Sequence, residues 1–345
     1  MKTNDKIYFL AYRYGNHAGP SGYDRFADYL GESIQPSKKL HWLGETLLRI
    51  PAKIASRMSG CFEYGRHDFV RELAVRNHMR SHQNGIYHFL YAEKSFRYSS
   101  RWNANNGHRI VGSFHHCAFK YSQYFQSTKH FSSISHAVVV SSIQLDHMEK
   151  IVGKGKVTVV PYAVDAEYFV PREKRGNHPL RCTCIGQHLR DYDGLQKMIP
   201  MVRDAIPEVE FYVLGANPEF DSMKDMPGVV YRKGIPDQEY LEILRQSDLL
   251  VLPLKDSTSV TTVNEALACG VPVITNKGGI SDYLNDQCAV QHEVGDFEGM
   301  ATTVIELLRD DRTRVLMGRA ARQRGQELHW PNSAAKMKQV YEKLQ

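Results

Sequence analysis

Short apolar runs alternate with helical patterns along the whole chain. In the first half these runs are IYFLAY from residue 7, IYHFLY from 86, RIVGSF from 109, AVVVSS from 137 and VTVVPY from 157. The second half repeats the rhythm with LRCTCIG from 180, EFYVLG from 210, GVVYRKG from 228, DLLVLP from 248 and PVITN from 272. Strands that alternate with helices predict right-handed βαβ units and parallel sheets. The fold class expected is therefore α/β, with two doubly wound, Rossmann-like domains.

The alternation is lost at about residues 164–175, where VDAEYFVPREKRGNHP gathers charge and proline. We therefore expect an N-terminal domain over residues 1–165 and a C-terminal domain over residues 166–330. A last helix over residues 331–345 is expected to pack back toward the first domain. Ligands of open parallel sheets lie beyond the carboxyl ends of the strands, so the motifs at those ends are expected to converge on one interdomain cleft.

The stretch from 248 to 279, DLLVLPLKDSTSVTTVNEALACGVPVITNKGG, places a hydroxyl-rich loop between a strand and a helix that begins near Thr262. The first amides of a helix lack partners, and the helix start carries about half a positive charge. The loop is therefore suited to an anion such as a diphosphate, and Glu265, one turn inside the helix, could reach a ribose hydroxyl beside it. The alternative is an ordinary strand-to-helix turn with a threonine cap and a solvated glutamate. The loop residues expected to contact the anion are Ser257, Ser259, Val260, Thr261 and Thr262.

Composition and cysteine usage are typical of a soluble cytoplasmic protein. Charged residues make up 24% of the chain and hydrophobic residues 42%. No run of about 18 apolar residues indicates a membrane span, and the first residues lack the apolar core of a signal peptide. The six cysteines are scattered through apolar contexts and are expected to be reduced thiols. Cys182 and Cys184 have no partner pair at zinc spacing, so no metal site is expected.

The charge is unevenly divided between the two halves. Residues 1–165 hold 22 Lys and Arg against 12 Asp and Glu, whereas residues 166–345 hold 22 against 26. A basic first half indicates an anionic partner, either a phospholipid surface, a lipid-diphosphate acceptor or a nucleic acid. No segment resembles a nucleic-acid-binding module, so nucleic acid ranks last.

One segment of the basic half, KKLHWLGETLLRIPAKIASRM at residues 38–58, has amphipathic helical spacing. Pro51 is expected to kink or divide this helix, and Trp42 suits a membrane interface. The segment either packs on the N-domain sheet with its basic side in water, or makes a peripheral contact with an anionic membrane. The apolar positions are Leu43, Leu47, Ile50, Ile54 and Met58, and the basic positions every four residues are Arg49, Lys53 and Arg57.

The loop GNHAGPSGYDRF, residues 15–26, joins the first strand to a helix expected from Tyr23. Gly19, Ser21 and Gly22 allow the backbone to approach a phosphate or an acceptor closely. A plain β-to-α turn is the alternative.

Six segments in the same order resemble the retaining GT-B glycosyltransferases of family 4, the glycosyl transferase group 1 type. They are HAVVVSSIQLDHMEK, VTVVPYAVDAEYFVP, FYVLGANP, VVYRKGIPDQEYLEILRQSDLLVLP, NEALACGVPVITNKGG and HWPNSAAKMKQVYEKL, from residue 136 onward. The resemblance implies an acceptor-binding N-domain and a nucleotide-sugar-binding C-domain that face each other across a cleft. It also implies transfer of a sugar with retention of its anomeric configuration. No metal and no cofactor beyond the nucleotide-diphosphate sugar is expected.

The resemblance also assigns site residues. His115, which follows a strand in GSFHHCAF, takes the place of the histidine that faces the donor sugar, and His116 is the weaker candidate. Ser21 and Gly22 fall in the family's glycine turn. Gly186 and Arg190 fall in its phosphate loop, which reads GQHLRDYDG here. The residues expected to act in catalysis are His115, Arg190 and Glu265.

The chain departs from the family pattern at three positions. Gln187 and Asp193 stand where the phosphate loop usually carries basic residues, which leaves Arg190 as its only arginine. Ser257 stands where the family has the first of two glutamates eight positions apart, although the neighbouring Asp256 could substitute. Arg190 has an alternative role as a surface arginine paired with Asp191 or Asp193.

The function predicted is a retaining, metal-independent glycosyltransferase that uses a UDP- or GDP-sugar in polysaccharide or glycolipid biosynthesis. Its acceptor is expected to be a glycan or lipid-linked, and its location the cytoplasm at the inner face of the plasma membrane, with no nucleic-acid partner. The alternatives are a catalytically inert GT-B subunit that acts as a partner or regulator, and a nucleotide-sugar epimerase. Donor turnover separates the first from the second, and epimer formation without an acceptor would identify the third.

Overall fold

The computed structural model describes residues 6–11, 13, 19–102, 107–172, 179–215 and 222–345. The chain divides into two compact units. Unit 1 holds the first strand, Gly22–Pro161 and Ser333–Gln345, and unit 2 holds residues 19–21 and Tyr162–Asn332. Parts of three predicted segments lie outside the described residues, namely 15–18 of the glycine-bearing loop, 173–178 of the expected linker and 216–218 of FYVLGANP.

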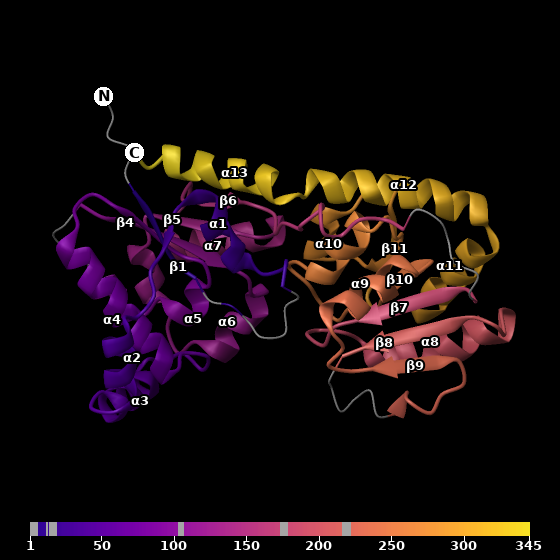
Figure 1. Cartoon of the computed structure of the whole chain (residues 1–345), viewed down its shortest axis with the longest axis horizontal. Coiled ribbons are helices and arrows are strands. Elements are labelled where there is room, and N and C mark those ends of the chain that lie inside the picture. Colours follow the sequence, from indigo (N-terminus) through magenta and orange to yellow (C-terminus); the bar gives the residue numbers. More distant parts are fainter. Residues whose placement is uncertain (1–5, 12, 14–18, 103–106, 173–178, 216–221) are drawn as a thin grey trace. The chain divides into compact units, whose positions relative to one another are not determined.

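Unit 1 contains a six-stranded sheet in the order β2-β1-β3-β4-β5-β6, and every neighbouring pair is parallel. β3 and β5 are buried along their whole length, which explains why they read as continuous apolar runs. Helices flank the sheet (Figure 1). The strands are β1 (Ile7–Leu10), β2 (Glu32–Ser33), β3 (Ile86–Phe89), β4 (Arg109–Phe114), β5 (His136–Val139) and β6 (Val157–Val159).

The helices of unit 1 begin with a short 3-10 turn, η1 (Tyr23–Arg25), at the residue where the sequence predicts a helix start. Three further 3-10 turns are η2 (Ser99–Arg101), η3 (Lys129–Ser133) and η4 (Ser142–Gln144). The α-helices are α1 (Phe26–Leu30), α2 (Lys38–Glu45), α3 (Arg49–Met58), α4 (Arg66–Ser81), α5 (Ala92–Ser95), α6 (Ala118–Tyr124), α7 (Leu145–Val152) and most of α13 (Trp330–Glu342).

The helix predicted over residues 38–58 is divided, but not at Pro51. α2 ends at Glu45 and α3 begins at Arg49, so the break lies at residues 46–48. Pro51 is the third residue of α3, where a backbone N–H would have no partner within the helix. The prediction that Pro51 kinks or divides the helix is therefore wrong, because proline is tolerated in a first turn.

Unit 2 contains a second all-parallel sheet in the order β12-β11-β10-β7-β8-β9. The chain steps outward from β7 through β8 to β9, then returns to the other side of β7 to form β10. The direction of the strand order therefore reverses between β7 and β10, where open α/β sheets bind ligands. The strands are β7 (Arg181–Ile185), β8 (Glu210–Leu214), β9 (Val229–Arg232), β10 (Leu249–Leu252), β11 (Val273–Asn276) and β12 (Ala289–His292).

The helices of unit 2 hold α10 firmly at its carboxyl end. A Cβ at Gly325 on α12 would lie 2.5 Å from the Ala268 Cα, so α12 approaches α10 closely there. Arg322 Nη1 donates to the Ala268 carbonyl at 2.7 Å. The helices are α8 (Tyr192–Ala205), α9 (Asp237–Arg245), α10 (Thr261–Ala268), α11 (Phe297–Arg309) and α12 (Asp311–Glu327), with a 3-10 turn η6 (Gly279–Tyr283).

All ten predicted strands are present, and the two doubly wound parallel sheets are confirmed. The sequence missed β2 and β12, which are two and four residues long. The six cysteines are all buried and free. Over the described ranges, the helices fall short of the length and apolar character needed to cross a bilayer.

Candidate functional site

In unit 2 the loops that follow β7 and β10 run against each other. Arg190 and Leu254 form an antiparallel bridge, and the Lys255 amide donates to the Leu189 carbonyl at 2.9 Å. Leu189 has a φ of 57°, a conformation that a non-glycine residue adopts only when its surroundings hold it there. The backbone at the switch point is thus fixed on both sides of Arg190.

Arg190 is anchored by two of its five N–H donors. Its Nε donates to the Ile185 carbonyl at 3.0 Å and its Nη1 to the His188 carbonyl at 2.9 Å. The Nη2 atom donates to no group among the described residues. Gly186 has a φ of 97°, and a Cβ there would lie 2.7 Å from this Nη2, so glycine leaves room for the guanidinium.

The alternative role for Arg190, a surface pair with Asp191 or Asp193, is not observed. Asp191 instead caps α8 and accepts from the Gly194 amide at 3.1 Å, and Asp193 is exposed in the first turn of that helix. Burial lowers the pKa of the Arg190 guanidinium. The side chain is thus partly withdrawn from water and tied to the backbone at the carboxyl end of β7.

The first turn of α10 has unused amides. Val260 is the N-cap residue and its side chain makes no capping bond. The first intrahelical bond runs from the Val263 amide to the Val260 carbonyl at 2.9 Å. In the part of the chain that the structure describes, the amides of Ser259, Val260, Thr261 and Thr262 donate to no protein group. The predicted alternative of a threonine cap is therefore wrong, and the donors required for an anion are present.

Glu265 is buried, with 4% of its surface exposed. One carboxylate oxygen accepts from Ser21 Oγ at 2.5 Å and the other accepts from the Tyr240 hydroxyl. Burial is the main cause that raises the pKa of this carboxyl group. The alternative of a solvated glutamate is thus wrong.

Residues 19–21 belong to unit 2 by their contacts, although they precede it in sequence by about 140 residues. The Gly19 amide donates to Asp237 Oδ2 at 2.6 Å, next to the contact between Ser21 and Glu265. Ser21 therefore lies at the predicted ribose carboxylate. Gly22 belongs to unit 1, where it has a φ of 122° and precedes η1.

Tyr240 is a site residue that the sequence analysis missed. It lies on α9, and burial together with Glu265 raises the pKa of its hydroxyl well above the usual value. The spacing of Tyr240, Leu241 and Leu244 could have placed it on the buried stripe of the helix. A tyrosine on such a stripe needs a hydrogen-bond partner for its hydroxyl. The sequence therefore indicated that Tyr240 has a polar partner in the interior.

Ser257 links two loops. Its Oγ accepts from the Ile280 amide at 3.2 Å, and its carbonyl accepts from the Gly279 amide at 3.0 Å. Asp256 Oδ1 accepts from the Ser257 amide at 2.7 Å. Both residues therefore help to hold the loop after β10 against the loop after β11.

In unit 1, His115 follows β4 as predicted. Its Nε2 lies 2.8 Å from the Leu90 carbonyl, and its ring stacks on Tyr91 and meets the edge of Tyr23. Burial lowers the pKa of His115, which favours the neutral imidazole, and the carbonyl partner assigns the proton of the neutral ring to Nε2. Its backbone amide donates to the buried Glu93 carboxylate.

His116 points to a different partner. Its Nε2 lies 3.1 Å from Glu63 Oε2, and its ring meets the edge of Tyr124. Burial by itself would lower the pKa of His116, but the hydrogen bond to Glu63 and the negative charges of Glu93 and Glu63 together raise this pKa. This arrangement is a structural ion pair at the end of β4.

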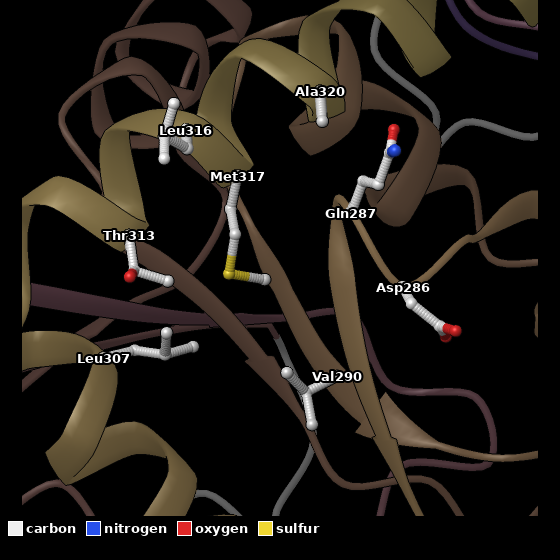
Figure 2. Close-up of a pocket in the computed structure, with 8 residues that line it drawn as sticks. All are labelled: Asp286, Gln287, Val290, Leu307, Thr313, Leu316, Met317 and Ala320. Carbon is white, nitrogen blue, oxygen red and sulfur yellow. The ribbon is translucent and has the colours of Figure 1, made fainter.

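A shallow pocket of about 520 Å³ lies elsewhere in unit 2, where β12, α11 and α12 meet (Figure 2). Figure 2 shows Met317 of α12 pointing between Leu307 and Val290. None of the predicted site residues lines this pocket, and apolar side chains dominate its wall. Over the described ranges, no group of three or more His, Cys, Asp or Glu side chains is arranged to hold a metal ion.

Comparison with known proteins adds family evidence. Residues 180–310 match the family model described as glycosyl transferases group 1. The GDP-mannose-dependent alpha-(1-6)-phosphatidylinositol monomannoside mannosyltransferase of Mycolicibacterium smegmatis is 25% identical over 199 residues, which cover 50% of each chain. The chain spans about half, or less, of the length of the curated relatives that it matches.

Two solved structures match nearly the whole chain. A glycosyltransferase from Rickettsia africae has a TM-score of 0.68 at 12% identity and covers 99% of both chains. The Anabaena protein HepE in complex with UDP has a TM-score of 0.68 at 12% identity, covering 98% of this chain and 100% of its own. These matches show the GT-B fold.

Proposed function

Because the chain belongs to the group 1 glycosyltransferase family, we propose that it is a retaining, metal-independent enzyme that moves a sugar from a nucleotide-diphosphate sugar to a glycan or lipid-linked acceptor. The observation that carries the proposal is a set of donors at the switch point of unit 2 that have no partner among the described residues. These are the four amides at the start of α10 and the Nη2 of Arg190.

These donors suit the diphosphate of a leaving nucleotide. Breaking the bond between sugar and phosphate leaves negative charge on the diphosphate, and fixed donors that meet this charge lower the barrier. Amides at a helix start and a guanidinium both bind phosphate oxygens without needing to reorganise. Gln187 and Asp193 stand where the family carries basic residues. We therefore propose that Arg190 and the amides stabilise the charge of the leaving diphosphate.

Glu265 is proposed to bind the ribose of the nucleotide. The carboxylate accepts two hydroxyl donors, from Ser21 and Tyr240. A ribose hydroxyl is a donor of the same kind, so it could replace the Ser21 hydroxyl on one oxygen. Tyr240 would then hold the other oxygen in position.

Unit 1 is proposed to bind the acceptor and to contribute His115. The ring nitrogen of His115 is held by Leu90, so its orientation is fixed before a substrate arrives. A neutral imidazole or its adjacent backbone can support a hydroxyl or a developing positive charge on a sugar.

The relatives support the donor and acceptor classes. The Mycolicibacterium smegmatis relative is named for GDP-mannose and for a phosphatidylinositol monomannoside, and HepE is in complex with UDP. We therefore propose a UDP- or GDP-sugar donor, a role in polysaccharide or glycolipid biosynthesis, and action in the cytoplasm at the inner face of the plasma membrane.

A second candidate is a catalytically inert subunit that keeps the nucleotide pocket. The observation in its favour is Ser257, whose hydroxyl and carbonyl are both used between loops where the family places a carboxylate. Such a subunit would bind a nucleotide but would not consume its sugar.

The test combines nucleotide binding with donor turnover. Thermal stabilisation by UDP, GDP and ADP without metal identifies the base, and the sugars of that nucleotide are then screened for release of the nucleoside diphosphate. Stabilisation with turnover supports the transferase, and stabilisation without turnover of any donor supports the inert subunit. Absence of stabilisation by all three nucleotides would refute both.

A further inference from the structure

The α2–α3 segment of unit 1 exposes an unusual number of large apolar side chains. Six of them fall within residues 42–62, with exposed fractions between 51% and 85%. They are Trp42, Leu47, Ile50, Ile54, Met58 and Phe62. Large apolar side chains that are exposed together within one segment indicate a surface that binds a partner.

α3 packs on the protein through its small residues and leaves its large ones outside. Ala52 and Ala55 are the buried side chains of this helix. At about 100° per residue these alanines share one side of the helix, and Ile50 and Ile54 lie on roughly the opposite side. The Tyr98 hydroxyl donates to the Ala55 carbonyl at 2.7 Å, which fixes this orientation. The alternative in which residues 38–58 pack on the N-domain sheet with their basic side in water does not describe α3, because its large apolar side chains face water as well.

Basic side chains accompany the apolar ones. Five exposed cations lie in the same segment, and none forms an ion pair with a described residue. Residues 38–62 contain a single acidic residue, Glu45, which is paired with Arg66 at 2.8 Å and lies 3.5 Å from His67. The cations are Lys38, Lys39, Arg49, Lys53 and Arg57. With the six apolar residues named above, they make up what we call the α2–α3 face.

We propose that the α2–α3 face docks on an anionic phospholipid surface. Ile50, Ile54 and Met58 would enter the boundary between headgroups and acyl chains, and the cations would meet the lipid phosphates. Long basic side chains suit this arrangement because their stems lie along apolar surface while their charges stay at the headgroups.

Charge decides between this occupant and a second copy of the chain. A symmetric dimer through the α2–α3 face would bring two sets of five unpaired cations together, whereas an anionic bilayer neutralises them. The inference deepens the proposed function by naming the membrane that presents its acceptor. The statement about the acceptor rests on the proposed function. Docking on the membrane does not, because it requires neither a nucleotide nor turnover.

The experiment measures binding of the full chain to phosphatidylcholine vesicles with and without phosphatidylglycerol. We expect binding to the anionic vesicles at low salt, at least about 10-fold tighter than to the neutral ones. Because the Debye length falls from about 10 Å at 0.1 M salt to about 3 Å at 1 M, high salt should weaken this binding.

Two pairs of substitutions separate the apolar and electrostatic parts. Ile50→Ser with Ile54→Ser should lower the partition coefficient about 10- to 100-fold at any salt concentration. Lys53→Gln with Arg57→Gln should lower it about 10-fold or more at low salt and little at 1 M. Both pairs change exposed side chains, so the melting temperature should stay within about 2 °C of the parent protein.

Matched controls lie on unit 2. Val294 and Val315 are also exposed apolar side chains, with 54% and 46% of their surface exposed. Val294→Ser with Val315→Ser should leave vesicle binding unchanged. An equal loss of binding in this control would overturn the assignment to the α2–α3 face.

Trp42 provides a direct signal of immersion. It is 60% exposed, whereas Trp330 is buried and Trp102 is partly buried. We expect a blue shift of the emission on anionic vesicles and quenching by brominated lipid, both of which disappear in Trp42→Phe.

Three results would overturn the proposal. They are absence of binding to anionic vesicles at low salt, unchanged binding of the Ile50→Ser, Ile54→Ser variant, and self-association of the chain that this variant abolishes. Nucleotide stabilisation and donor turnover are measured separately without vesicles. A chain that binds vesicles but turns over no donor would refute the transferase and keep the membrane face.

Discussion

Replacing Arg190 by alanine tests the proposed diphosphate site most directly. The guanidinium already donates to the Ile185 and His188 carbonyls, so the substitution removes two charge-assisted hydrogen bonds as well as the free Nη2 donor. Loss of the two internal bonds is expected to lower the free energy of unfolding by about 1–3 kcal/mol. The loss stays in this range because water can then reach the two carbonyls. Loss of the donor to a phosphate is expected to cost a further about 1.5–3 kcal/mol of nucleotide binding, or roughly 10- to 150-fold in affinity.

These figures predict a specific pattern of thermal shifts. A nucleotide at 100 times its dissociation constant stabilises the parent protein by about 2.7 kcal/mol. If its affinity falls 10- to 100-fold in Arg190→Ala, the same concentration stabilises the variant by only about 0.4–1.4 kcal/mol. A unit of this size shifts by about 2–4 °C per kcal/mol, so the ligand-induced shift should fall from about 5–11 °C in the parent protein to about 1–6 °C in the variant. Turnover should fall by about 100- to 1,000-fold, because the donor acts mainly on charge that develops during bond cleavage.

Arg203→Ala is the matched control. Arg203 also donates to a backbone carbonyl in unit 2, that of Val209 at 2.7 Å, but it lies in the last turn of α8, far along the chain from the loop after β7. It should lower the melting temperature by a similar amount and leave the nucleotide-induced shift intact. Near-normal nucleotide stabilisation and turnover in Arg190→Ala would refute its role, as would an equal loss of the shift in Arg203→Ala.

Three further predictions concern carboxylates and their hydrogen-bond partners. Because the folded state raises the pKa of Glu265, its contribution to stability is fully present below the ordinary glutamate pKa of about 4.3 and is lost as the pH rises through the raised value. In calorimetry, the parent protein should therefore lose melting temperature relative to Glu265→Gln as the pH rises from 4 toward neutrality; a pH-independent difference would contradict this. Tyr240→Phe removes a hydrogen-bond donor to the same carboxylate, a donor that lowers the pKa of Glu265. We therefore expect this substitution to lower the free energy of unfolding by about 1–3 kcal/mol and to move the pH dependence to higher pH. An unchanged melting curve would show that the Tyr240–Glu265 hydrogen bond does not form. Glu63→Gln should lower the pKa of His116 measured by NMR, because the hydrogen bond to Glu63 raises this pKa while burial lowers it. An unchanged titration would show that the His116–Glu63 pair does not form in solution.

Much of the fold was predictable because strand and helix signals are local. The ten apolar runs correspond to ten strands, and the helix that carries Glu265 begins at Thr261, one residue from the predicted start. β2 was missed because two residues carry no period, and β12 was missed because AVQH contains only two apolar residues and so lacks the apolar run that marked the other strands. Pro51 was misjudged because its effect depends on its position in the helix, and the position follows from where the chain between α2 and α3 turns.

The site was predictable only in part. The hydroxyl-rich loop, the helix start and Arg190 were identified from the sequence and from the family resemblance, and the structure places Arg190 and the loop after β10 side by side. The sequence could not show that Ser257 and Asp256 also make hydrogen bonds within and between the loops. Tyr240 was missed because it lies 25 residues before its partner, and no local pattern reports a contact at that separation.

By itself the sequence determined the alternation of strands and helices, the two-unit organisation, the resemblance to a glycosyltransferase family and the excess of positive charge in the first half. These properties depend on residue periodicity and composition, which act over a few neighbouring residues. The tertiary structure decided the strand order that brings β7 beside β10, the burial of Glu265 and the choice of its hydroxyl donors. It also decided that α3 buries Ala52 and Ala55 and exposes Ile50 and Ile54. An amphipathic pattern shows which side chains share a side of a helix, but which side is buried depends on the shape of the surface that the helix packs against.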